Sequence, residues 1–223
     1  MLIVLSPAKS LDFEPVTLKS SVTEPRLTSD TAKLATRTKK LSRAEIRKLM
    51  KLSEDLADLN YERYQSLASN PSPNDAKAAL FAFNGDVYRG LAAKTLSDAA
   101  VSRAQTQLRI LSGFYGLLRP LDLIHPYRLE MGTKLKTDAG SSLYDFWGDS
   151  ITKMLKKDLK SVKAMSLINL ASDEYSNSLD LDALGVNIIN VKFLQKDGGK
   201  EKFISFFAKR ARGLMARWMS EHR

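Results

Sequence analysis

A lysine and a pair of carboxylates each follow an apolar segment that is typical of a buried strand. Lys9 lies just beyond the apolar run 2–5, and Asp173 and Glu174 lie just beyond the apolar stretch 166–171. If these two strands are parallel neighbours, their ends meet at one edge of the sheet, where open sheets bind ligands. A lysine beside two carboxylates could hold a phosphate or act as an acid or base. A surface ion pair that contributes little is the alternative.

A turn that contains two glycines, Gly113 and Gly116, follows a predicted helix over residues 98–111. With a short second helix after it, this arrangement resembles a helix-hairpin-helix, in which main-chain amides hold a DNA phosphate without reading bases. Arg109 and Arg119 flank the turn as candidate phosphate partners. The glycines are one residue further apart than in the usual motif, so a plain helix–helix turn is the alternative.

Two other arginines lie within three residues of an acidic residue in the sequence. Arg89 comes three residues after Asp86, which can cap the helix that follows the Asn84-Gly85 turn. Arg128 comes two residues before Glu130, so both side chains share one side of an extended chain. Each arginine is a candidate for phosphate contact, with a local ion pair or a structural turn as the alternative.

Two segments are rich in basic residues. The stretch 33–51 carries eight lysines and arginines against Glu45 alone, and residues 208–221 form a predicted basic amphipathic helix. Lys209 and Arg212 are three residues apart and share a face of that helix, close to several aromatic residues. Basic and aromatic side chains together suit a nucleic-acid backbone. A solvated charged face is the alternative in both segments.

The composition narrows the possible chemistry. The 223 residues include 35 Lys and Arg against 25 Asp and Glu, a net charge of +10, which points to a polyanion or a phosphorylated ligand. The chain has no cysteine and two histidines. Disulfides, thiolate nucleophiles and cysteine or histidine-rich metal sites are therefore excluded. We expect no metal site and no cofactor.

The elements that must position these residues indicate an α+β protein, with a central sheet surrounded by helices in a single domain over residues 1–223. Helices dominate the middle of the chain, and the first strand must return to pair with strands near the end. The apolar runs are too short to span a bilayer and no signal peptide is present, so we expect a cytoplasmic protein without a membrane partner. The predicted strands are residues 2–5, 164–171, 187–194 and 202–207, the last two joined at Asp197-Gly198-Gly199.

Six segments, in order along the chain, resemble the YaaA family of bacterial peroxide-stress proteins, also designated UPF0246. They are Ile3–Lys9, Phe83–Tyr88, Leu111–Leu121, Pro126–Gly132, Ile168–Tyr175, and Ile204–Phe206 with Lys209, Arg212 and Gly213. The resemblance implies a cytosolic protein that protects against hydrogen peroxide and is associated with lower free iron. It also implies a mixed fold of unusual topology, with a basic cleft and DNA binding through a helix-hairpin-helix element. Family members often continue past the last basic helix, so we expect this chain, which ends at Arg223, to be a short or truncated member.

Our first interpretation is a protein, expected to be monomeric, that binds double-stranded DNA in the peroxide-stress response. The expected cleft comprises Ser6, Lys9, Asp173 and Glu174. The expected DNA contacts are Lys9, Arg89, Arg109, Gly113, Gly116, Arg119, Arg128, Lys209 and Arg212. The alternative is an enzyme that acts on a nucleobase or a phosphorylated nucleotide in the same cleft. In that case Lys9 would hold the anion and one of the carboxylates would transfer protons. An enzymatic activity is less favoured than binding, and its catalytic residues are unknown.

Overall fold

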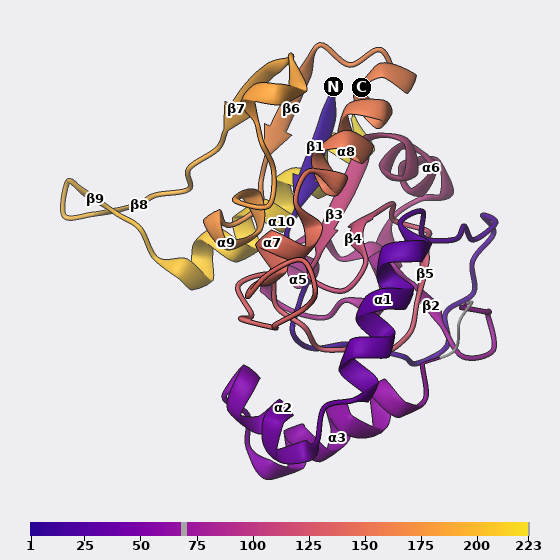
Figure 1. Cartoon of the computed structure of the whole chain (residues 1–223). Helices are drawn as coiled ribbons and strands as arrows, with labels where there is room; N and C mark the ends of the chain where they lie inside the picture. Colours follow the sequence, from indigo (N-terminus) through magenta and orange to yellow (C-terminus); the bar gives the residue numbers. More distant parts are fainter. Residues whose placement is uncertain (68–70, 223) are drawn as a thin grey trace.

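The central sheet is built around the first strand of the chain. A computed structural model describes residues 1–67 and 71–222. Its main sheet has five strands in the order β4-β3-β1-β6-β7 (Figure 1). β1 (Leu2–Leu5) runs parallel to both neighbours, β3 (Leu108–Ser112) and β6 (Ser166–Asn169). β7 (Asn187–Asn190) is parallel to β6, whereas β4 (Gly116–Leu118) forms an antiparallel hairpin with β3.

The predicted pairing of the first strand with a late strand is confirmed. Val4 is opposite Asn169, and the Leu170 amide donates to the Val4 carbonyl oxygen at 3.0 Å. All four residues of β1 are buried, as expected for a parallel strand that is covered on both faces. The carboxyl ends of β1 and β6 therefore lie at the same edge of the sheet.

Helices surround this sheet, which confirms the predicted mixed class. One hydrophobic cluster extends from Leu2 to Met219. In Figure 1 the α2–α3 pair and the β8–β9 hairpin extend from the body in different directions. The other elements are α1 (Thr28–Lys39), α2 (Arg43–Met50), α3 (Glu54–Gln65), β2 (Lys77–Ala78), α4 (Ala79–Ala82), α5 (Asp86–Leu91), η1 (Ala93–Thr95), α6 (Asp98–Gln107), β5 (Leu123–Ile124), α7 (Leu143–Trp147), α8 (Ser150–Ser161), α9 (Asp173–Ser176), η2 (Asp182–Leu184), β8 (Gln195–Asp197), β9 (Lys200–Lys202) and α10 (Ser205–Glu221).

The late part of the chain differs in part from the prediction. The turn at Gly198-Gly199 does join two antiparallel strands, but these are the short β8 and β9, which pair apart from the central sheet. The predicted strand over 202–207 is wrong, because α10 begins at Ser205.

The predicted helix-hairpin-helix is also wrong. α6 ends at Gln107, and the next five residues form β3 instead of a further helical turn. β4 follows the turn, so the two glycines lie in a β-hairpin, with Ser112 opposite Gly116. The apolar residues over 108–111 fit helical spacing, but pairing with β1 on one side and β4 on the other fixes them as a strand.

The two glycines of this hairpin have packing roles inside the protein. A Cβ atom at Gly113 would lie 2.3 Å from the Leu129 carbonyl oxygen, and the Gly113 carbonyl accepts a 3.0 Å hydrogen bond from Trp147 Nε1. Gly116 has a φ of +70°, and a Cβ atom there would lie 2.8 Å from the Trp147 ring. Residues 112–118 are all buried. Their amides therefore do not form the expected phosphate site.

α10 is held against α5 at a close crossing. A Cβ atom at Gly213 would lie 1.8 Å from the Val87 carbonyl oxygen, so only glycine fits at this distance. Nearby, Arg217 donates to the carbonyl oxygens of Leu91 and Ala92 at the end of α5, both at 3.1 Å. These contacts hold the second half of α10, from Gly213 on, against α5.

Candidate functional site

A cavity of about 240 Å³ lies at the carboxyl edge of β1 and β6. We call it the edge cavity. It is lined by residues 6–10 after β1, residues 84–87 at the start of α5, Glu130, residues 172, 174 and 175 around α9, and two cations of α10. Lys9 and Glu174 line it together with Lys209 and Arg212, as the sequence predicts. Segments more than 160 residues apart in the chain thus form one site.

Two serines connect the strand ends beneath this cavity. The Ser172 amide donates to Ser6 Oγ at 2.9 Å, and the two hydroxyl oxygens are 3.2 Å apart. The Tyr88 hydroxyl donates to the Ser6 carbonyl oxygen at 3.1 Å. Burial raises the pKa of Tyr88 well above its ordinary value, so the phenol keeps its proton at neutral pH. The backbone at the end of β1 is therefore fixed from two sides.

The cavity wall carries charges of both signs. Lys9 Nζ lies 2.5 Å from Glu130 Oε2, and the other carboxylate oxygen of Glu130 is 3.4 Å from Arg128 Nη2. Glu174 Oε1 accepts a hydrogen bond from the Gly132 amide at 3.0 Å. Lys9 thus pairs with Glu130 instead of the expected Asp173 or Glu174, while Glu174 lines the same cavity with its own main-chain partner.

The two cations of α10 differ in burial. The Arg212 guanidinium is half-buried, and its Nε has no hydrogen-bond partner among the described residues. Burial lowers the pKa of Arg212, and the negative charge of Asp173 opposes that shift. Asp173 itself does not line the cavity. Lys209 is exposed and has no salt-bridge partner within the described part of the chain.

Arg89 and Arg128, two of the expected DNA contacts, lie beside the edge cavity without lining it. The Arg89 guanidinium is 68% exposed and lies 3.6 Å from the Asp86 carboxylate, which does line the cavity. Arg128 is mostly buried, and its guanidinium contacts Glu130, which lines the cavity. Arg89 is thus free to contact a ligand, whereas Arg128 helps to hold a wall residue.

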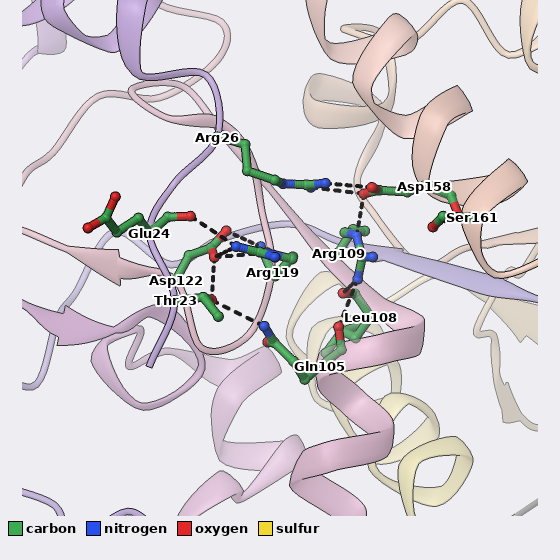
Figure 2. A network of polar contacts seen from close by, with 10 residues as sticks. All are labelled: Thr23, Glu24, Arg26, Gln105, Leu108, Arg109, Arg119, Asp122, Asp158 and Ser161. Carbon is green, nitrogen blue, oxygen red and sulfur yellow. Dashed lines mark hydrogen bonds and ion pairs between the residues drawn. The ribbon is translucent and has the colours of Figure 1, made fainter. Parts of the chain in front are cut away.

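Arg109 lies in a buried ion network away from the cavity (Figure 2). Its Nε donates to Asp158 Oδ2 at 2.5 Å, and Arg26 donates to the same carboxylate from the other side. Burial opposes ionisation of Asp158, but the two arginines outweigh it and hold the pKa of that carboxyl below its ordinary range. The Arg109 side chain is 5% exposed and is committed to this structural contact.

Arg119 belongs to the neighbouring network in Figure 2. Its amide and its Nε both donate to the Asp122 carboxylate, and its Nη2 donates to the Glu24 carbonyl oxygen at 3.0 Å. The Asp122 side chain is fully buried, and Thr23 donates to it as well. Arg119 therefore anchors the loop over residues 23–24 to the chain after β4.

The cavity lining also includes residues without a functional signal of their own in the sequence, among them Asn84 and Ser172. Both lie in segments that carry the family resemblance, but nothing in their spacing pointed to a shared site. Within residues 1–67 and 71–222, no group of three or more His, Asp or Glu residues is placed to hold a metal ion. None of the helices in that part of the chain has the length and apolar character needed to cross a membrane.

The fold and the site together define a mixed α/β protein with a small charged cavity at the carboxyl edge of its parallel strands. Residues 1–223 match the family described as peroxide stress protein YaaA. UPF0246 proteins of Phenylobacterium zucineum and Aliivibrio fischeri are 49% and 48% identical over 223 residues, which is 100% of this chain and 83% and 86% of theirs. A UPF0246 protein of Idiomarina loihiensis is 49% identical over 219 residues, 98% of this chain and 85% of its own. The chain therefore belongs to the YaaA (UPF0246) family of peroxide-stress proteins.

Proposed function

We propose that this protein binds duplex DNA through phosphate contacts at the edge cavity, as part of its role in peroxide stress. The observation that carries the proposal is the half-buried Arg212, which lines the edge cavity and forms no salt bridge with the described residues. A buried cation without a full set of partners is unfavourable until an anion reaches it. Lys9 and Lys209 line the same cavity and add positive charge at the same place.

A phosphate group fits this arrangement of donors. Arginine and lysine contact phosphate oxygens with charge-assisted hydrogen bonds, and such contacts position a duplex without reading its bases. The net charge of +10 favours approach of a polyanion from solution. Binding should therefore weaken steeply as salt increases and depend little on sequence.

Two variants test the proposal. Arg212→Met removes a charge that the fold does not fully satisfy, so stability should be retained while duplex affinity falls about tenfold, the size of one charge-assisted contact. Lys209→Gln should give a similar fall. Lys157→Gln, at an exposed lysine of α8, is the matched control and should leave affinity unchanged.

Fluorescence anisotropy with two unrelated duplexes at two salt concentrations measures the affinity, and thermal unfolding reports stability. Loss of stability in Arg212→Met with unchanged affinity would assign Arg212 a structural role and overturn the proposal. Equal affinity in low and high salt would also contradict it.

A second candidate function is favoured by the carboxylates of the same cavity. Asp86, Glu130 and Glu174 line it beside the cations, although negative charge repels a phosphate backbone. In an enzyme that acts on a nucleobase or a phosphorylated nucleotide, Lys9 would hold the anion and Glu174 would transfer protons. Incubation with nucleotides and DNA, followed by chromatography, tests this. A released base or phosphate that disappears in Glu174→Gln would support it.

An association with lower free iron, which the family resemblance implies, is part of the same proposal at the level of the cell. We expect a strain that lacks the protein to contain more chelatable iron under peroxide and more oxidised DNA. Electron paramagnetic resonance of chelator-treated cells measures the iron. Complementation with Arg212→Met separates the two effects: if DNA binding is the cause of protection, this variant fails to restore it.

A further inference from the structure

A groove beside the edge cavity gathers an unusual amount of positive charge. It lies between α1, α2 and the segment 132–136, with a volume of about 580 Å³. Five cations line it against a single carboxylate, that of Glu45, and we call it the basic groove. The cations are Arg37, Lys48, Lys51, Lys134 and Lys136.

The basic residues in and next to α2 fall into two groups, one paired with α3 and one that lines the groove. Arg43 contacts Glu62 and Arg47 contacts Glu54, both on α3. Lys48 and the adjacent Lys51 line the groove instead. The basic run over residues 33–51 is thus not one uniform face, because only part of it is neutralised inside the protein.

The groove lysines have no such neutralisation. None of Lys48, Lys51, Lys134 and Lys136 forms a salt bridge within the described residues. The Glu45 carboxylate is engaged by the amide and hydroxyl of Ser42 in a capping box at the start of α2. Gathered like charges repel one another, so this cluster is unfavourable for the isolated protein and favours an anionic partner.

The segment 132–136 alternates between exposed and buried residues, so its two lysines lie on the same side. Thr133 and Leu135 are buried, whereas Lys134 and Lys136 are exposed. The Arg37 Nε donates to the Lys136 carbonyl oxygen at 2.9 Å, which ties the segment to α1. Both lysines are thus held beside the lysines of α2.

A hydrogen bond links the lining of the basic groove to the lining of the edge cavity. Gly132 lines the groove, and its amide donates to Glu174, which lines the cavity. Glu130, two residues earlier, also lines the cavity. The groove and the cavity are therefore neighbours at the segment 130–132.

We infer that the basic groove is a second phosphate-binding surface, and that a duplex bound at the edge cavity extends its backbone along it. This inference rests on the proposed DNA binding. The groove lining includes no aromatic side chain, so contacts there would be made to the backbone without base stacking. An anionic lipid surface or an acidic protein would be attracted by the same charges, and the test separates them.

The test compares two double variants with the same change in charge. Lys134→Gln with Lys136→Gln removes two groove charges, and Lys157→Gln with Lys160→Gln removes two exposed charges of α8. The affinity for a duplex is measured across a salt series. We expect the groove variant to lower affinity about tenfold and to reduce the salt slope by about 2, since each lost phosphate contact changes the slope by about 1. The α8 variant should match the wild type.

The outcomes distinguish the groove from the cavity. If Lys209→Gln weakens binding but the groove variant behaves as the α8 variant does, the groove inference is overturned and the proposed function stands. Vesicles with anionic phospholipid and a single strand of the same length are the other probes. A groove variant that loses vesicle binding but keeps duplex affinity would assign the groove to a lipid surface instead. If the wild type binds no duplex in low salt, both proposals fail.

Discussion

The Gly132 amide donates a hydrogen bond to Glu174 Oε1, and this 3.0 Å contact joins the wall of the edge cavity to the basic groove. Glu174 follows β6, whereas Gly132 belongs to the loop before α7, so two distant segments meet there. The Tyr144 hydroxyl also donates to the Glu174 carbonyl oxygen, at 2.7 Å. A fixed carboxylate thus stands between the edge cavity, whose lining carries charges of both signs, and the basic groove.

Replacing that carboxylate by its amide separates the two candidate functions. We expect Glu174→Gln to raise duplex affinity about two- to fivefold, the size of one partly exposed charge interaction. The amide oxygen can still accept from Gly132, so the loop should keep its place. Asp182→Asn, at an exposed carboxylate outside the cavity, is the control and should have no effect. Weaker duplex binding by Glu174→Gln would contradict simple phosphate binding at this cavity.

The Asp158 carboxylate, shared by two arginines, should contribute to the stability of the fold but not to DNA binding. Asp158→Asn leaves Arg26 and Arg109 without their common negative partner, so we expect a loss of about 3–5 kcal/mol in the free energy of unfolding. Urea denaturation measures it. Asp149→Asn breaks an exposed pair with Lys153 at the start of the same helix and should lose at most about 1 kcal/mol. A folded Asp158→Asn protein with much weaker duplex binding would return Arg109 to the list of DNA contacts.

The position of the edge cavity was predictable because parallel strands bring their carboxyl ends together. Two apolar runs, each followed by charged residues, were enough to place Lys9 and Glu174 in one site. The partner of Lys9 was not predictable in the same way. Glu130 reaches it from a loop whose course depends on the packing of the β3–β4 hairpin.

β3 was missed because its residues satisfy two patterns at once. Leu108 and Leu111 continue the apolar face of α6, and the same stretch is also a short apolar run that fits a strand buried on both faces. Only the contacts with β1 and β4, from distant parts of the chain, decide between them. Because residues 108–112 form a strand, the two glycines lie in a β-hairpin and not in the predicted helix-hairpin-helix.

A run of basic residues in the sequence does not show which of its charges are neutralised within the fold. The density of lysines and arginines over residues 33–51 was visible, but not which of them α3 neutralises. Lys134 and Lys136 alternate with Thr133 and Leu135, a sequence signal for one exposed side of an extended segment. Only the structure shows which basic side chains form ion pairs within the protein and which remain available to a partner.

The close crossing of α5 and α10 should be sensitive to a single methyl group. A Cβ atom at Gly213 would lie 1.8 Å from the Val87 carbonyl oxygen, so Gly213→Ala must push the helices apart. We expect a loss of about 1–3 kcal/mol in stability, together with weaker duplex binding because Lys209 and Arg212 move with α10. Thermal unfolding and anisotropy measure the two effects.

The neighbouring Leu214 provides the control for that variant. Its side chain is 52% exposed on the same helix, so Leu214→Ala should change neither stability nor affinity by much. Full affinity in a folded Gly213→Ala protein would mean that the position of α10 does not determine DNA binding.

The Asp12 carboxylate should make stability depend on pH in the acid range. Its hydrogen bond with Lys94 Nζ, at 2.7 Å, is the main cause that lowers the pKa of Asp12 to about 2, with help from the Glu14 amide and the nearby Lys77. An aspartate in the unfolded chain has a pKa of about 3.9. As pH falls, the unfolded chain therefore takes up its proton first. The stabilisation is complete above about pH 4 and is lost as pH falls toward 2.

Asp12→Asn removes this titration and isolates its effect. We expect the variant to be less stable than the wild type by a constant amount between pH 5 and 7. Because a protonated Asp12 resembles the amide, the difference should shrink steadily below about pH 4 and approach zero near pH 2. Guanidinium denaturation at pH 7, 5, 4 and 3 measures the free energy of unfolding of both proteins. A difference that is as large at pH 3 as at pH 7 would show that Asp12 does not hold its charge through the contact with Lys94.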